Sequence, residues 1–244
     1  MNYKQILKKI PLFSQLLRRV LFFFKPHIRN RFDVMKKEKI NVVLDVGAHH
    51  GEFAQHLRFN GYKKKIVSFE PVSQSFKFLQ KSAKKDSSWE CQNFALGEVA
   101  KKAEINVLNC TPASSFFEPN DLMMKTYGPM MGKQNKELVE IKRLSDIHSQ
   151  ICNDSDSIFL KIDAQGYEKL ILEGAGEFLN KIKLVYFEVS LVQVYKNEPT
   201  ISEMIDYMSS KGFIPISIEL EEWLQKKMQY LQVDILFRNA ALCE

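Results

Sequence analysis

The sequence lacks the cysteine spacings that mark a zinc site or a disulfide framework. Its four cysteines lie far apart and form no C-x-x-C pair: Cys91, Cys110, Cys152 and Cys243. Structural zinc sites use closely spaced Cys and His ligands, and disulfide frameworks belong to oxidising compartments. We therefore expect reduced thiols, a cytoplasmic chain and no metal site.

The sequence also lacks long apolar runs where a targeting segment would lie. The longest run within residues 1–39 is Val20 to Phe24, five residues, whereas a membrane-spanning helix needs about 20. A secretory signal needs an apolar core of about 7 to 15 residues and a small-residue cleavage site, and this segment has neither. The sequence predicts no membrane-spanning segment and no cleaved signal.

Charge is distributed unevenly along the chain. The formal net charge is +6, yet residues 1–39 contain eleven Lys or Arg against only Asp33 and Glu38. This segment carries +9, which leaves −3 for the other 205 residues. A near-neutral body with a basic arm indicates an arm that meets an anionic surface, and it makes nucleic acid an unfavoured partner.

The basic arm has a helical apolar stripe. Apolar residues recur at steps of three and four: Ile6, Ile10, Phe13, Leu17, Val20, Leu21 and Phe24. The pattern predicts an amphipathic helix kinked at Pro11. Its apolar face can pack on the body of the protein or on a second copy in a homo-oligomer. Alternatively, residues 1–38 contact a membrane or glycolipid surface peripherally.

From residue 40 onward, short apolar segments alternate with helical ones, which is typical of a parallel sheet with crossover helices. Seven strands are predicted, at Val42–Val46, Lys65–Phe69, Cys91–Leu96, Ser157–Ile162, Lys183–Val189, Phe213–Glu219 and Val233–Phe237. Helices are predicted at Glu52–Asn60, Ser73–Lys85, Tyr167–Leu172 and Ile201–Lys211. Residues 221–230 form at most a short helix, so an antiparallel closing strand fits. The sequence predicts a helical arm over residues 1–39 and one doubly wound, Rossmann-like α/β domain over residues 40–244.

One segment interrupts this alternation. Ala103–Leu108 and Leu138–Ile141 have the pattern of additional edge strands. Between them, Asn109–Lys136 is rich in Pro, Met, Phe and Gly without a steady period. Because a loop of this length in a compact domain is usually functional or disordered, we interpret it as a lid over the substrate.

The chain has no G-x-G-x-x-G motif, which in dinucleotide-binding folds places the pyrophosphate on a helix N-terminus. A different pattern, D-x-G-x-x-x-G, follows the first strand over Asp45–Gly51. Gly47 and Gly51 permit backbone angles and close approaches that a Cβ would prevent, and Asp45 offers negative charge to a cationic ligand. S-adenosylmethionine has a sulfonium and an ammonium but no phosphate, so the turn indicates a site for this cofactor.

Further acidic residues follow the predicted strands. Glu70 comes directly after the second strand, where ligands bind in open α/β sheets, and its carboxylate can accept both ribose hydroxyls. Asp163 and Glu188 end two later strands and are therefore expected at the same edge. Ala95 and Leu96 follow the third strand and are expected to line an adenine pocket.

Several blocks together resemble the FkbM family of methyltransferases. The resemblance covers roughly residues 40–238. The blocks are Asp45-Val46-Gly47-Ala48 with Gly51, Phe69-Glu70-Pro71, Ala95-Leu96-Gly97, Ser114-Ser115, Lys161-Ile162-Asp163 with Gly166 and Glu168, Leu172-Glu173-Gly174-Ala175, and Phe187-Glu188-Val189-Ser190 with Tyr195 and Gly212-Phe213. Seven blocks in register are hard to attribute to chance.

This resemblance implies a seven-stranded sheet of the class I methyltransferase type, S-adenosylmethionine binding at the first two blocks, and methyl transfer to an oxygen. The acceptor in the family is often a sugar or a polyketide-like molecule. The cofactor-binding residues expected on this basis, together with the strand-edge argument, are Asp45, Gly47, Ala48, His49, Gly51, Glu70, Pro71, Ala95 and Leu96. The chain departs from the family pattern at His49, where Asn is usual, and at Gln165, where Glu is common.

Asp163 is the first candidate for the catalytic carboxylate, as a general base or as the group that positions an acceptor hydroxyl. Glu188 is the competing candidate. His49 and His50 could act as bases, but in a glycine turn they are better explained as shaping the cofactor loop. The function expected is O-methylation of a sugar, glycan or other small-molecule acceptor. RNA ribose methylation, a nicotinamide-dependent reductase and a non-catalytic binding module remain alternatives.

Overall fold

The computed structural model describes residues 26–108, 114–131, 134–220, 223–224 and 229–243. The chain divides into two compact units, Met1–Lys39 and Ile40–Glu244. In the first unit, α3 (Pro26–Lys37) is a helix with Lys36 and Lys37 in its last turn. The amphipathic helix predicted around Pro11 lies outside the described residues. None of the helices in the described ranges is long and apolar enough to cross a membrane.

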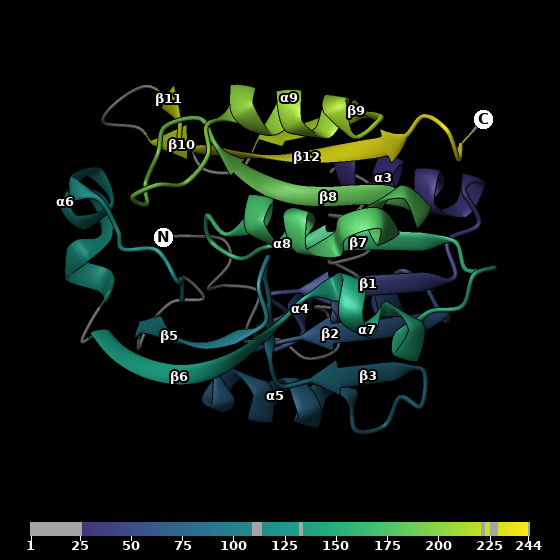
Figure 1. The fold of residues 1–244 in the computed structure, drawn as a ribbon, viewed down its shortest axis with the longest axis horizontal. Helices are drawn as coiled ribbons and strands as arrows, with labels where there is room; N and C mark the ends of the chain where they lie inside the picture. Colours follow the sequence, from purple (N-terminus) through teal and green to yellow (C-terminus); the bar gives the residue numbers. More distant parts are fainter. Residues whose placement is uncertain (1–25, 109–113, 132–133, 221–222, 225–228, 244) are drawn as a thin grey trace, which may run out of the picture. The chain divides into compact units, whose positions relative to one another are not determined.

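The second unit contains a seven-stranded sheet in the order β3-β2-β1-β7-β8-β12-β9 (Figure 1). Its strands are β1 (Val42–Val46), β2 (Lys65–Phe69), β3 (Trp89–Gln92), β7 (Ile158–Ile162), β8 (Ile182–Ser190), β9 (Phe213–Leu220) and β12 (Gln232–Asn239). The strands from β3 to β8 pair in parallel, whereas β12 is antiparallel to both of its neighbours. This arrangement confirms the doubly wound sheet of the class I methyltransferase type with an antiparallel last strand.

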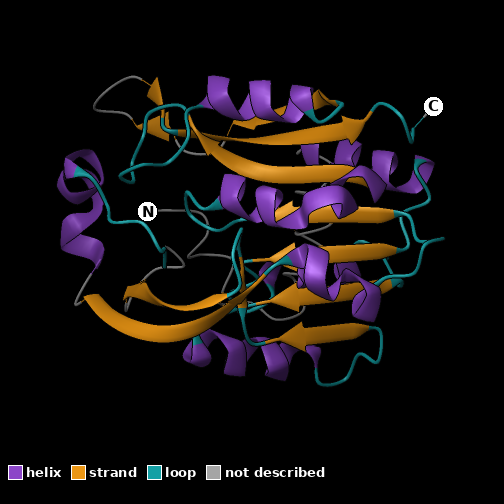
Figure 2. Ribbon diagram, viewed as in Figure 1, coloured by secondary structure: helices purple, strands orange, loops and turns teal. Residues whose placement is uncertain are grey.

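Helices cover both faces of the sheet (Figure 2). On one face lie α7 (Leu144–Ile151), α8 (Glu168–Ala175), the 3-10 helix η2 (Gly176–Lys181) and α9 (Ile201–Ser210). On the other face lies α4 (Glu52–Phe59), where the Phe53 ring stacks on those of Phe159 and Tyr186. The helix α5 (Ser73–Ala83) connects β2 to β3. Neither α7 nor η2 was predicted from the sequence.

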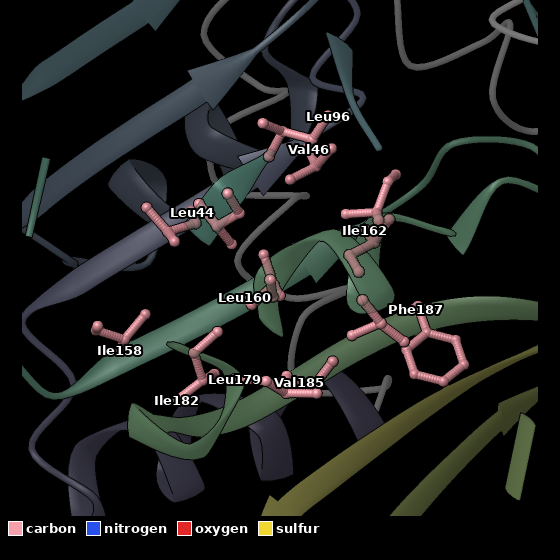
Figure 3. Packing of buried hydrophobic residues seen from close by; sticks show 14 of the residues in the cluster. Leu44, Val46, Leu96, Ile158, Leu160, Ile162, Leu179, Ile182, Val185 and Phe187 are labelled. Atoms are coloured by element: carbon pink, nitrogen blue, oxygen red, sulfur yellow. The ribbon is translucent and has the colours of Figure 1, made fainter. Parts of the chain in front are cut away.

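The core explains why the central strands β1 and β7 are apolar except for one charged residue each, Asp45 and Lys161. Every residue of β1 and β7 is buried, as expected for parallel strands with both faces covered. Leu44, Leu160 and Phe187 are fully buried and pack in one layer with Val46 and Val185 (Figure 3). This rigid layer supports the carboxyl ends of β1, β2 and β7.

One predicted strand is wrong, and one further segment forms strands that were not predicted. The single strand predicted over Cys91–Leu96 is interrupted, because Asn93 donates its side-chain amide to the carbonyl oxygens of Glu70 and Pro71, and only Ala95–Leu96 continues as β4. Residues 221–230 contain no helix in their described part: β10 (Trp223–Leu224) pairs antiparallel with β11 (Gln229–Tyr230). Trp and Tyr, which are paired in this ladder, favour strands.

The inserted segment forms a sheet of its own. The strands β5 (Lys101–Leu108) and β6 (Gln134–Lys142) pair with each other and, through β6, with β4. They were predicted as edge strands of the main sheet, but the order β4-β6-β5 makes a separate layer. The segment between them contains α6 (Asp121–Met131). Figure 1 shows β5, β6 and α6 beyond one end of the main strands.

Candidate functional site

The glycine turn after β1 is built by close backbone contacts. Gly47 has a φ of 69°, and the backbone N–H groups of Gly47 and Ala48 both donate to the carbonyl oxygen of Phe69 at 3.0 Å. A Cβ added at Gly47 would lie 1.8 Å from the carbonyl oxygen of Asp163. Only glycine fits this position, and its small size lets the ends of β1, β2 and β7 converge.

Glu70 links this turn to the end of β2. One carboxylate oxygen accepts the backbone N–H of His49 at 2.8 Å, and the other accepts that of Val72 at 2.9 Å. Burial raises the pKa of Glu70 to about 7, although both of these hydrogen bonds favour the charged form. The group therefore changes charge near neutral pH.

Asp45 lies beneath the turn in a buried polar network. Its carboxylate is fully buried, with Lys161 Nζ 3.1 Å from Oδ1 and the Ser68 hydroxyl donating to Oδ2 at 3.0 Å. Burial lowers the pKa of Lys161, but the charges of Asp45 and Asp163 outweigh it and raise this pKa overall. Asp45 was expected to face the cofactor cation, but Lys161 occupies its carboxylate and Asp45 does not line the cavity described next.

A cavity of about 660 Å³, open to solvent, lies at the carboxyl ends of β1, β2 and β7. Six of the nine predicted cofactor residues line it: Gly47, His49, Glu70, Pro71, Ala95 and Leu96. Asp45, Ala48 and Gly51 do not. Small-molecule sites have mostly apolar walls with a few placed polar groups, and the wall of this cavity combines apolar side chains with the carboxylates of Glu70 and Asp163.

Much of the wall was not predicted from the sequence. These residues are Val72, Ser75, Ile105, Ser114, Phe116, Ala164, Tyr167 and Ile171, beside the expected Asp163. Phe94 also lines the cavity and belongs to residues 93–96, which the sequence places at the adenine pocket, and Ser114 belongs to one of the family blocks. Nothing in the sequence around Ile105 and Ile171 indicates a binding site, because only the fold brings these two side chains to the cavity.

Part of the segment that we interpret as a lid, residues 109–136, borders the cavity. Ser114 and Phe116 line the cavity, and the rings of Phe116 and Tyr167 lie 4.8 Å apart. The Ser115 hydroxyl donates to the backbone carbonyl of Gln165 at 2.7 Å. This part of the segment is therefore a wall of the cavity and is joined to the turn after β7.

Asp163 lines the same cavity and has a half-exposed side chain, with 46% of its surface accessible. Its Oδ2 lies 3.8 Å from Lys161 Nζ. Its Oδ1 accepts a hydrogen bond from Gln165 Nε2 at 2.9 Å. A carboxylate that is oriented on two sides and open on a third can reach a bound molecule.

Glu188 does not share this cavity. It lines a smaller one of about 250 Å³ together with Glu168 and Glu198, and it accepts a hydrogen bond from Gln232. Burial raises the pKa of Glu168 to about 8, with a further contribution from the charge of Asp163. The two predicted catalytic carboxylates are thus placed in different cavities, with Asp163 on the side of the predicted cofactor residues.

His49, His50 and Glu52 form a cluster whose candidate ligand atoms lie within 4.8 Å of one another. The two imidazole rings stack at 3.7 Å, and His49 Nδ1 lies 3.3 Å from Glu52 Oε1. Glu52 also accepts the backbone N–H of His50 at the start of α4. These contacts shape the turn, and the partial positive charge of a helix N-terminus disfavours a cation there.

The comparison with protein families decides the assignment. The model of the "Methyltransferase FkbM domain" matches residues 45–215, which is more than half of the chain. The chain belongs to the FkbM methyltransferase family. The prediction of S-adenosylmethionine as the cofactor of this FkbM methyltransferase agrees with that membership.

Individual relatives of the FkbM chain are distant. "Methyltransferase 1" of Beauveria bassiana (strain ARSEF 2860) is 22% identical over 203 residues, which are 79% of each protein. The solved structure of M. capricolum TrmK with S-adenosyl-homocysteine is 10% identical with a TM-score of 0.45, and 86% of this chain aligns with 68% of that one. An uncharacterized protein of Listeria monocytogenes serotype 4b has the same identity and TM-score, with 82% of this chain covering 62% of that longer one.

Proposed function

We propose that this FkbM methyltransferase binds S-adenosylmethionine in the 660 Å³ cavity and transfers its methyl group to a hydroxyl oxygen of a sugar, glycan or other small molecule. The observation that carries the proposal is that Glu70 and Asp163 line one cavity beside the glycine turn. One carboxylate suits a ribose and the other suits a reacting hydroxyl. The roles of both residues are part of the proposal.

The wall of the cavity fits the chemistry of the cofactor. Glu70 uses both oxygens to hold the backbone of the turn, and each oxygen retains a second acceptor direction for a ribose hydroxyl. Phe94, Ala95 and Leu96 offer an apolar surface for a purine ring. When bound, S-adenosylmethionine supplies an electrophilic methyl group on a positively charged sulfur.

Asp163 is the proposed proton acceptor for the hydroxyl. Lys161 lies 3.8 Å from one oxygen and Gln165 donates to the other, so the carboxylate is oriented before a substrate arrives. A positioned base typically contributes about 10² to 10⁴ in rate. Alignment of the acceptor with the methyl group supplies the rest, because proximity and orientation can lower a barrier by about 7 to 11 kcal/mol.

The charge around Asp163 favours a neutral acceptor over a polyanion. Besides the carboxylate of Asp163 in the first cavity, that of Glu188 lines the second cavity, and the wall of that second cavity also contains Gly166, three residues after Asp163. Carboxylates accept hydrogen bonds from hydroxyl groups but repel phosphates. This supports a sugar-like acceptor and disfavours RNA ribose methylation, which the sequence left as an alternative.

For residues 1–38 we propose peripheral contact with anionic lipid or glycolipid on the cytoplasmic side. The support is the net charge of +9 in residues 1–39 and the apolar stripe of that segment. Sedimentation of the full chain with anionic and neutral vesicles tests this. We expect the chain to sediment with anionic vesicles and not with neutral ones, and salt should weaken this binding. Sedimentation with neither kind of vesicle, or equally with both, would contradict the proposal.

The acceptor class is tested by methyl incorporation from labelled S-adenosylmethionine. Neutral glycans, lipid-linked glycans and RNA are offered in parallel under the same conditions. We expect label in a neutral or lipid-linked glycan and none in RNA. Label in RNA ribose alone would contradict the proposal and leave the methyltransferase assignment intact.

A further inference from the structure

Three side chains form a continuous line of hydrogen bonds, two from the turn after β7 and one from the segment after β8. Gln165 Nε2 donates to Asp163 Oδ1 at 2.9 Å, and the hydroxyl of Tyr195 donates to Gln165 Oε1 at 3.0 Å. Tyr195 is 2% exposed. The amide of Gln165 has one orientation that satisfies both neighbours, because a carboxylate accepts and does not donate.

The backbone of Gln165 is held in an unusual conformation. Its φ is 54°, which residues with a Cβ rarely adopt. The Ser115 hydroxyl donates to its carbonyl oxygen. The following Gly166 has a φ of 96°, and a Cβ there would lie 3.2 Å from Glu198 Cβ. Such strained conformations persist only where neighbouring contacts hold them in place. Here these contacts direct the side-chain amide of Gln165 toward Asp163.

The charges that face this line come from several elements. Lys161 on β7 is the cation beside Asp163, and Glu168 on α8 is a nearby carboxylate. Burial raises the pKa of the Tyr195 hydroxyl above its ordinary value, and the charges of Glu188, Glu168, Glu198 and Asp163 raise it further. The phenol therefore stays protonated across the physiological range and acts as a constant donor to Gln165.

We propose that Gln165, oriented by Tyr195, is a positioning residue that holds the Asp163 carboxylate toward the cavity through a hydrogen bond to Oδ1. The inference rests on the proposed function, in which Asp163 accepts the proton of the substrate hydroxyl. An amide suits the position because it accepts from a phenol and donates to a carboxylate. A glutamate here could only accept, and its charge would oppose that of Asp163.

The test is the titration of the Asp163 carboxyl carbon by ¹³C NMR in protein labelled at aspartate, with the resonance assigned from the D163N spectrum. No substrate is present, so a failed methyl-transfer assay does not affect the result. In Q165E the added carboxylate should move the titration midpoint upward from the wild-type value by about one pH unit or more. Q165L removes the donor, and Y195F frees the amide to rotate, so both should give smaller upward shifts.

Q232E is the matched control, because Gln232 donates to Glu188 in the neighbouring cavity and the substitution adds the same charge away from Asp163. S-adenosylmethionine affinity is measured in parallel and should stay within about twofold in all of these variants, because Gln165 does not line the cofactor cavity. An unchanged midpoint in folded Q165L and Y195F, or a shift in Q165E no larger than in Q232E, would overturn the proposal. If Q165E does not fold, Q165L and Y195F decide the question.

Discussion

The carboxylate of Glu70 accepts the backbone N–H of His49 at 2.8 Å, and this bond joins the end of β2 to the glycine turn after β1. The same carboxylate holds Val72 at the start of the next connection. One buried acid thus orders two loops that line the cavity. The effect of Glu70 on ligand binding can be separated from its effect on structure by comparing Glu70→Ala, which removes the side chain, with Glu70→Gln, which removes only the charge.

We expect Glu70→Ala to weaken S-adenosylmethionine binding, because it removes the proposed acceptor for the ribose hydroxyls. A hydrogen bond to a charged group is worth on the order of 1.5 to 3 kcal/mol, so the Kd should rise about 10- to 150-fold. Calorimetric titration measures this directly. Glu90→Ala is the control, because Glu90 on β3 forms a partly exposed ion pair with Lys65 on β2, and it should leave the Kd unchanged. An unaltered Kd in folded Glu70→Ala would show that the ribose is bound elsewhere.

The pKa of Glu70 predicts a dependence of cofactor affinity on pH. With a pKa of about 7 in the folded chain, the carboxylate is mostly neutral at pH 6 and mostly ionised at pH 8. If the ionised form binds the hydroxyls, affinity should rise by up to about tenfold between these values. Glu70→Gln should abolish this rise, and a similar rise in both proteins would assign it to another group.

The same pKa predicts a change in stability with pH. The folded-state pKa lies above the ordinary value of 4.5, so below pH 4.5 the group is neutral in both states. Between pH 4.5 and 7 the unfolded chain ionises while the folded one does not, and stability falls by about 3 kcal/mol. The difference between wild type and Glu70→Gln in urea unfolding, measured across this range, should show that fall. A flat difference would contradict the assigned pKa.

Gly47→Ala should destabilise the fold far more than Gly61→Ala. Both glycines have a positive φ, 69° and 89°, but a Cβ at Gly61 meets nothing within 4 Å. Gly61→Ala therefore reports backbone strain alone, about 1 to 2 kcal/mol. Gly47→Ala adds the clash with the carbonyl of Asp163, typically about 1 to 3 kcal/mol more. Equal losses of unfolding free energy would mean that the approach of β1 and β7 is not tight.

Asp163→Asn keeps the shape of the side chain and removes its basicity. On an acceptor found by the methyl-incorporation screen, turnover should fall about 10²- to 10⁴-fold, with the Kd for S-adenosylmethionine little changed. Glu188→Gln, in the separate smaller cavity, should have a much smaller effect. The reverse order of the two effects would make Glu188 the base.

The strands of the main sheet could be predicted because each is marked by a short apolar pattern in its own sequence. Buried parallel strands such as β1 and β2 are short, mostly apolar segments, and their predicted bounds match the structure residue for residue. The break at Asn93 could not be predicted, since it depends on hydrogen bonds to Glu70 and Pro71 from another loop. The separate sheet of β5 and β6 depends on pairing across 26 or more residues, which no local pattern encodes.

Some residues of the candidate site could likewise be predicted from local sequence, and others could not. Gly47 and Glu70 could be placed at the sheet edge because each directly follows a strand. Asp45 could not be placed correctly, because its partner Lys161 lies 116 residues away in the chain and the pairing arises only when β1 and β7 lie side by side. Asp163 follows β7 and Glu188 lies near the carboxyl end of β8, so the strand pattern alone could not show that the two carboxylates line different cavities.

Calorimetric titration of the full chain with S-adenosylmethionine and, in parallel, with NADH tests the central claim most directly. The cavity is lined by Glu70 and an apolar wall beside a D-x-G-x-x-x-G turn, which suits a cationic nucleoside and not a pyrophosphate. The account predicts binding of S-adenosylmethionine in the micromolar range and no binding of NADH. Binding of NADH without binding of S-adenosylmethionine would contradict it.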